Sequence, residues 1–272
     1  QTWIEHRQTS GTSAGTINHG LQVVRRILNL AAGEWIDDQG LTWLQAAPKI
    51  KFLTNHARRQ PYPISWQEQA CLFRALPDHL AEMALFAVNT GCRDKEICRL
   101  RWDWELPVPE LGTSVFIIPG SKVKNADSRL VVLNRAAWSV VNRRRGKHPV
   151  HVFTYRGDPI GYMLNSGWRK ARQEAGMPQV RVHDLKHTFG RRLRAAGVSF
   201  EDRQDLLGHR SGRITTHYSA AELSRLLEAA DRVCEHDGGR PELVILRGAL
   251  ISNSRKTPAK SGLPIGVPEP IH

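Results

Sequence analysis

Six side chains suited to phosphate chemistry stand in four separate stretches of this 272-residue chain. A phosphodiester attacked by a side-chain oxygen gains negative charge on its non-bridging oxygens, which fixed cations stabilise. The attacking oxygen must lose a proton and the leaving oxygen must gain one. The cations, proton donors and hydroxyl group for such a reaction are Arg93, Lys124, His183, Lys186, His209 and Tyr218.

The first stretch, NTGCRDKEICRLRW (89–102), places Arg93 just after Gly91, where a new helix is expected to begin. Asp94 and Glu96 suit the positive end of that helix. An arginine on such a turn can direct its planar fork at two phosphate oxygens, and Glu96 can hold it through an ion pair. The alternative is that Arg93 is an ordinary surface arginine that takes no part in a functional site.

The second stretch, SKVKNADSR, carries Lys122 and Lys124 between two β-rich runs, 114–120 and 128–134. These runs predict two strands joined by a basic turn. A lysine on such a turn can protonate a leaving alkoxide, although turn lysines commonly serve only to keep a sheet edge solvated.

The third stretch, HDLKH, places His183 and Lys186 three residues apart, so both fit one face of a helix. The opposite, core-facing stripe consists of Leu185, Phe189 and Leu193.

The fourth stretch, LLGHRSGRITTHY, has His209 directly after a glycine that is expected to stop a helix. Tyr218 follows nine residues later, just before another helical pattern. An ordinary helix end and a packing tyrosine are the alternative interpretations.

The three histidines also allow a zinc site, because two histidines four apart on a helix plus a third can bind zinc. His183, His187 and His209 are the candidate ligands, but Asp184 stands where the known protease motif has Glu. This hypothesis leaves Arg93 and the tyrosine unexplained. His187 is also suited to a place in the core.

In their order and spacing, TGCRDKE, VKNADSRLVVLN, HDLKHTFG and LLGHRSGRITTHY resemble the catalytic domain of phage-type integrases of the tyrosine recombinase family. The resemblance covers about residues 60–235. It extends weakly to the first helix, which looks like the end of the family's core-binding domain.

The resemblance implies a role for each matching residue. Arg93 would clamp the phosphate, with Glu96 as its structural partner, and Lys124 would protonate the leaving 5′ oxygen. His183 would assist proton transfer and His209 would donate a hydrogen bond to the phosphate. Tyr218 would attack and form a 3′-phosphotyrosyl link to DNA, with neither metal nor cofactor.

Lys186 departs from the family pattern, which usually has arginine at this position. Lysine keeps the charge but loses the bidentate fork, and we expect a slower but active enzyme. The arm-type DNA-binding domain of many integrases is also not among these residues. Because the chain does not begin with Met, we expect a fragment or a processed product.

The elements that must position these residues follow from periodicity and capping signals. An amphipathic helix is predicted over 15–33, and Ser65 with Glu68 forms a capping box for the next helix. Helices at about 184–196 and 200–207 are separated by Gly197, and another helix follows Tyr218.

We therefore predict a mainly α fold with a small antiparallel β-sheet (α+β), with the sheet carrying Lys124. The predicted domains are a partial helical core-binding domain and linker (1–60), a catalytic domain (61–235) and a flexible C-terminal tail (236–272). The tail includes one short apolar run, ELVIL.

A net charge of +13 favours a polyanionic partner. Because the chain has no run of eighteen apolar residues and its first residues, QTWIEHRQTS, have no apolar region, we expect neither a transmembrane helix nor a signal peptide. Four cysteines without C-x-x-C spacing favour a cytoplasmic protein with reduced thiols. Double-stranded DNA is the expected partner. The resemblance implies a homo-tetramer on DNA, with accessory DNA-bending proteins.

Three functions remain open: an integrase that cuts and rejoins DNA, a DNA-binding protein of the same fold without the chemistry, and a zinc hydrolase. A type IB topoisomerase uses related chemistry, but the LLGH block and the chain length favour a recombinase.

Overall fold

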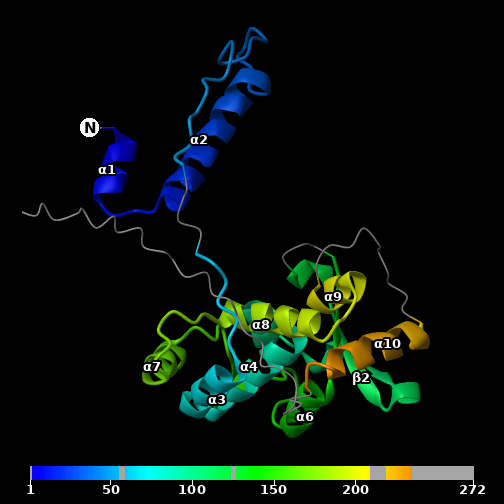
Figure 1. Cartoon of the computed structure of the whole chain (residues 1–272). Coiled ribbons are helices and arrows are strands. Elements are labelled where there is room, and N and C mark those ends of the chain that lie inside the picture. Colours follow the sequence, from blue (N-terminus) through cyan, green and yellow to red (C-terminus); the bar gives the residue numbers. More distant parts are fainter. Residues whose placement is uncertain (1, 55–58, 124–126, 209–218, 235–272) are drawn as a thin grey trace, which may run out of the picture. The chain divides into compact units, whose positions relative to one another are not determined.

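A computed structural model describes residues 2–54, 59–123, 127–208 and 219–234 (Figure 1). The chain divides into two compact units, Gln1–Pro61 and Tyr62–His272. The predicted tail, 236–272, lies outside the described residues. All six candidate residues belong to the second unit by position.

The first unit is built on two helices, α1 (Trp3–Thr9) and α2 (Ala14–Gly33). The predicted helix over 15–33 is therefore present, and the side chain of Ser13 caps its start. Ile17, Leu21 and Ala31 are buried as the apolar stripe predicts, but Val24 from the same stripe is exposed. The described part of this small unit covers only some of the apolar face of α2.

The second unit is mainly helical. Its helices are α3 (Trp66–Ala75), α4 (Asp78–Thr90), α5 (Asp94–Cys98), α6 (Arg135–Arg144), α7 (Ser166–Glu174), α8 (Val182–Ala195), α9 (Phe200–Leu207) and α10 (Ala220–Asp231). Ser65 and Glu68 form the predicted capping box at the start of α3. The side chain of Ser199 caps α9.

One three-stranded antiparallel sheet, ordered β1-β2-β3, accompanies these helices. Its strands are β1 (Glu105–Val108), β2 (Thr113–Ile118) and β3 (Arg129–Val132), and Phe116 pairs with Val131. The runs at 114–120 and 128–134 thus form the predicted pair. The third strand, β1, was not predicted; it is short and contains Pro107, which suits an edge strand because proline cannot donate a ladder hydrogen bond.

A two-stranded sheet lies elsewhere in the second unit. It consists of β4 (Thr154–Tyr155) and β5 (Asp158–Pro159).

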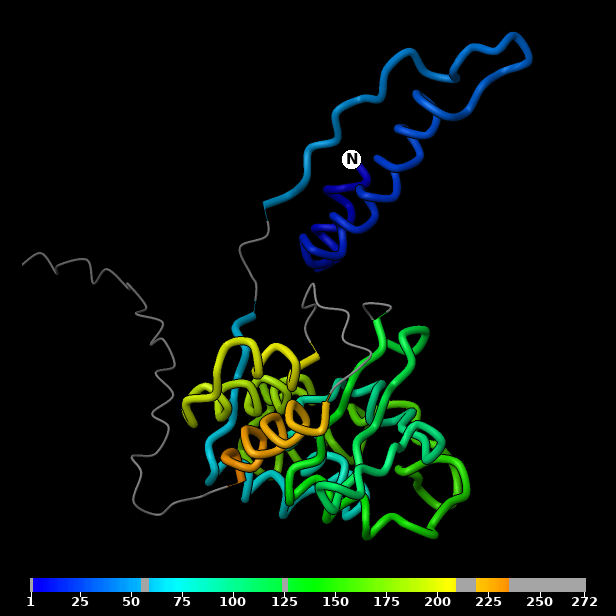
Figure 2. The backbone as a smooth tube through the Cα atoms, turned by 90° about the vertical axis from the view of Figure 1, so that its right-hand side faces the viewer, coloured from blue at the N-terminus to red at the C-terminus, as the bar shows by residue number. Residues whose placement is uncertain are grey.

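Strands β2 and β3 are buried on both faces, so their residues alternate between two core clusters. Phe116 and Val131 pack into the cluster that contains much of α4, whereas Val115 and Val132 pack into the one that contains Leu226 of α10. Helix α8 contacts α4 and α9, and α9 contacts α10. Figure 2 shows α8 and α9 in yellow beside α10 in orange.

Helix α8 has a separate polar connection to the start of the second unit. The carboxylate of Asp184 accepts a hydrogen bond from the backbone N–H of Tyr62 at 3.0 Å, and the hydroxyl of Thr188 accepts one from Ile64 at 3.0 Å. Both side chains are buried. These bonds fix α8, the helix that carries His183 and Lys186, against residues more than a hundred positions earlier.

Candidate active site

Arg93 occupies the N-cap of α5, directly after the turn that ends α4. Its backbone N–H donates to one carboxylate oxygen of Glu96 at 2.8 Å, and its Nη1 donates to the other at 2.7 Å. The arginine side chain is 22% exposed and that of Glu96 only 3% exposed. The predicted ion pair is thus present, and it holds the guanidinium at the protein surface.

Glu96 has a second cationic partner, the buried Arg129 of β3, whose Nη1 forms an ion pair with the same carboxylate. Burial by itself raises the pKa of Glu96. The charge of Arg129 and the hydrogen bonds from Arg93 oppose this effect and hold that pKa below its usual value. Glu96 is therefore a carboxylate shared by two arginines.

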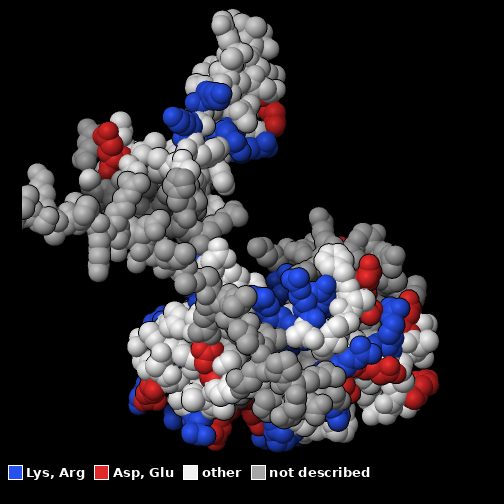
Figure 3. Space-filling view, viewed as in Figure 1, with Lys and Arg blue, Asp and Glu red and all other residues white. Residues whose placement is uncertain are grey.

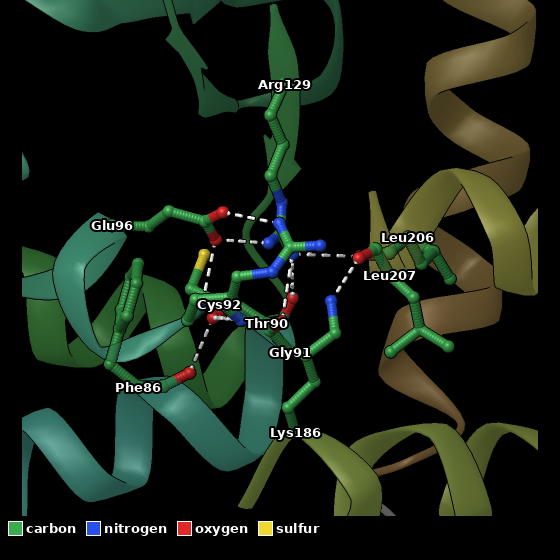
Figure 4. A network of polar contacts seen from close by, with 10 residues as sticks. Phe86, Thr90, Gly91, Cys92, Glu96, Arg129, Lys186, Leu206 and Leu207 are labelled. Atoms are coloured by element: carbon green, nitrogen blue, oxygen red, sulfur yellow. Dashed lines mark hydrogen bonds and ion pairs between the residues drawn. The ribbon is translucent and has the colours of Figure 1, made fainter. Parts of the chain in front are cut away.

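Arg129 also connects distant parts of the backbone (Figure 4). Its Nη2 donates to the carbonyl oxygens of Thr90 at 3.2 Å, Gly91 at 3.0 Å and Leu206 at 3.4 Å. The first two belong to the turn before Arg93, and the third lies in the last turn of α9. Sequence reasoning missed this residue, since a polar residue at the start of a predicted strand gives no local signal of burial.

Lys186 is buried, with 6% of its surface exposed, and its Nζ donates to the carbonyl oxygen of Leu207 at the end of α9. Burial, helped by the charges of Arg129 and Arg93, lowers the pKa of Lys186 to about 7. The structure therefore places this lysine deeper than its neighbour His183, which is exposed.

The imidazole of His183 stands edge-on to that of His187, with ring centroids 4.8 Å apart. Partial burial lowers the pKa of His183, followed by the charges of His187, Lys186 and Arg93. These influences mean that Arg93 and Lys186 lie within electrostatic range of His183. His187 is half-buried rather than enclosed in the core.

Two glycines allow these segments to approach each other. Gly91 has φ +61°, and a Cβ there would lie 2.8 Å from the ring of Phe189. Gly208 has φ +58°, and a Cβ there would lie 2.7 Å from Nε of Arg129. The glycines of the TGCR and LLGH blocks therefore serve both a left-handed turn and close packing.

The structure brings together three of the six predicted residues: Arg93, His183 and Lys186. The other three, Lys124, His209 and Tyr218, lie outside the described residues. Lys124 directly follows Val123, the last described residue before it, and His209 directly follows Gly208.

Figure 3 shows a group of Lys and Arg side chains in a hollow of the second unit. Within the described ranges, no group of three or more His, Cys, Asp or Glu side chains is arranged to hold a metal ion. His209, the third ligand in the zinc hypothesis, lies outside the described residues. No helix in the described part is long and apolar enough to cross a membrane.

Comparison with known proteins agrees with this arrangement. The model of the phage integrase family matches residues 68–225, more than half of the chain. The integrase of Salmonella phage P22 is 28% identical over 229 residues, which are 78% of this chain and 56% of the relative. The tyrosine recombinase XerC of Brucella suis biovar 1 is 26% identical over 247 residues, 85% of this chain and 76% of the relative.

Solved structures share the fold. The XerH site-specific recombinase bound to a palindromic difH substrate has a TM-score of 0.58 at 18% identity, covering 84% of this chain and 67% of that structure. The Tn1549 transposon integrase in complex with circular intermediate DNA has a TM-score of 0.56 at 15% identity, covering 82% and 81%. The chain, which spans little more than half the length of the P22 integrase, belongs to the phage integrase family.

Proposed function

We propose that this chain is the catalytic part of a site-specific DNA recombinase, which cleaves and rejoins DNA through a 3′-phosphotyrosyl intermediate. The observation that carries the proposal is the convergence of two separately held cations. Arg93 is fixed by Glu96, Lys186 is fixed by Leu207, and both influence the same histidine. Such an arrangement suits a phosphate group that gains charge during attack.

The proposed reaction is a transesterification. The Tyr218 oxygen attacks the phosphorus, a new P–O bond forms to the tyrosine, and the bond to the 5′ oxygen breaks. His183 takes up the tyrosine proton, while Lys124 gives a proton to the 5′ oxygen. Arg93, Lys186 and His209 bind the non-bridging oxygens. Rejoining reverses each step, so the phosphodiester energy is kept in the protein–DNA bond and no metal is required.

The electrostatics of the described residues support this assignment. Arg93 and Arg129 both bind the carboxylate of Glu96. The charges of these two arginines help to lower the pKa of Lys186, and the charges of Lys186 and Arg93 help to lower the pKa of His183. A phosphate dianion or phosphodiester placed there would reduce this repulsion. A lowered pKa also favours the neutral imidazole that a general base requires.

Double-stranded DNA is the proposed partner. The net charge of +13 supports phosphate contacts, and the XerH and Tn1549 structures were solved with DNA. Because recombination joins two duplexes, we propose assembly as a homo-tetramer on DNA, with accessory DNA-bending proteins and a cytoplasmic location.

A suicide-substrate assay tests the proposal. Nicked duplex DNA that carries the candidate attachment site is incubated in EDTA with the wild-type chain, Tyr218→Phe or the control Tyr162→Phe, which alters an exposed tyrosine of the second unit. We expect a denaturation-resistant protein–DNA band with wild type and the control but not with Tyr218→Phe. DNA binding without any band would instead favour a binding protein that lacks the chemistry. A band that persists in Tyr218→Phe would refute the assigned nucleophile.

A further inference from the structure

Arg129 is a fully buried charged group beside the candidate active site, with 2% of its side chain exposed. Its guanidinium binds the carboxylate of Glu96 and three carbonyl oxygens from two separate segments. Because both of its Nη atoms already donate to protein acceptors, we assign Arg129 no direct contact with a DNA phosphate. Any part in the reaction must act through the groups that it holds.

We infer that Arg129 is a positioning residue of the candidate active site, which joins the turn that carries Arg93 to the end of α9 ahead of His209. The inference rests on the proposed recombinase function. Figure 4 shows the connection: Arg129 descends from β3 between Glu96 on one side and the end of α9 on the other.

The first connection runs through Glu96. Both oxygens of this buried carboxylate are used, one by the backbone and Arg129 and the other by the guanidinium of Arg93. A buried carboxylate that loses one of its two cationic partners keeps a negative charge that is no longer fully balanced. Without Arg129, Glu96 would therefore bind Arg93 more strongly or take up a proton, and either change would alter the direction of the Arg93 fork.

The second connection runs through the end of α9. Arg129 donates to Leu206, and Lys186 donates to the adjacent carbonyl of Leu207. Two cations thus bind the negative end of one helix, an arrangement that the helix dipole favours. Gly208 packs directly on the Arg129 side chain.

Lysine cannot replace Arg129 in this position. The planar guanidinium reaches Glu96 with Nη1 while Nη2 reaches the carbonyls of Thr90, Gly91 and Leu206. A single ammonium group can keep the buried charge but cannot span acceptors on opposite sides. Arg129→Lys therefore keeps the buried positive charge but loses the contacts that join the two segments, so it tests the positioning role by itself.

The experiment compares Arg129→Met and Arg129→Lys with a matched control, Arg144→Met. Arg144 is also a buried arginine, paired with Glu82 at 2.6 Å, but in α6 and apart from this network. Thermal unfolding, DNA affinity and the rate of covalent complex formation are measured for each protein below its unfolding midpoint. We expect both Arg129 variants to form the complex at least about tenfold more slowly, because small displacements of catalytic groups cost this much or more.

DNA affinity should change far less than the rate, and Arg144→Met should cleave like wild type despite its lost ion pair. Folded Arg129→Lys that forms the complex at the wild-type rate would overturn the inference. So would an equal loss of rate in Arg144→Met, because a general loss of stability would then explain the effect. Arg129→Lys retains the buried charge and carries the test if Arg129→Met does not fold.

A second readout needs no DNA. The Lys186 ammonium is titrated by NMR in lysine-labelled protein and assigned by its absence in Lys186→Met. Removing the Arg129 charge should raise the pKa of Lys186, whereas Arg144→Met should leave it unchanged. If wild type forms no Tyr218-dependent complex, the proposed function fails and this titration alone judges the placement of Arg129. An unchanged Lys186 pKa in Arg129→Met would overturn the inference.

Discussion

Replacing Lys186 by methionine should remove a pH-dependent part of the free energy of unfolding. The ammonium is buried, donates to Leu207 and stands near two arginines. Methionine has a similar length and no charge. The substitution therefore removes the titrating group while leaving the volume of the site nearly unchanged.

The size of the effect follows from the pKa of Lys186, which falls from 10.5 to about 7 on folding. Between these values the unfolded chain binds more protons than the folded chain, so the free energy of unfolding rises with pH. At 1.36 kcal/mol per pH unit, the difference between 10.5 and about 7 corresponds to about 5 kcal/mol. This gain is absent below pH 7 and is complete only above pH 10.5.

Urea denaturation at several pH values between 7 and 10 measures the effect. The difference in free energy of unfolding between wild type and Lys186→Met should increase with pH by about 1.4 kcal/mol per unit, and other titrating groups largely cancel in this difference. Lys170→Met, which alters a lysine with an 80% exposed side chain in α7, controls for the loss of one lysine. A difference that stays constant across this range would refute the argument that Lys186 is buried with a lowered pKa.

Two further predictions concern the same site. Lys186→Arg should still cleave DNA, and its kcat/KM should decline less above pH 7 than that of wild type, because guanidinium stays protonated; loss of covalent complex formation would contradict this view. Gly91→Ala should lower the free energy of unfolding by about 2–4 kcal/mol, since it adds a clash with Phe189 to the cost of a positive φ. Gly112→Ala, at φ +59° with no atom within 4 Å of a Cβ, should cost only about 1–2 kcal/mol, and equal losses in urea denaturation would exclude the clash.

Much of the fold is predictable from the sequence because its signals are local. The capping box of Ser65 and Glu68, the left-handed Gly91 and the stripe of α8 each depend on residues at most eight positions apart. The β2–β3 pair is predictable for the same reason. The edge strand β1 was missed because four residues interrupted by Pro107 carry too weak a pattern.

The candidate active site is likewise only partly predictable from the sequence. The order of the four blocks by itself identifies the candidate residues, and Arg93 and Lys186 both act electrostatically on His183. Only the tertiary structure reveals that Arg129 is buried, because its partners lie 33 residues away at Glu96 and 77 residues away at Leu206. The same is true of Lys186, whose low pKa arises from burial and from arginines of other segments. Charge and periodicity can be read along a chain, whereas the desolvation of a charged group depends on which distant segments enclose it.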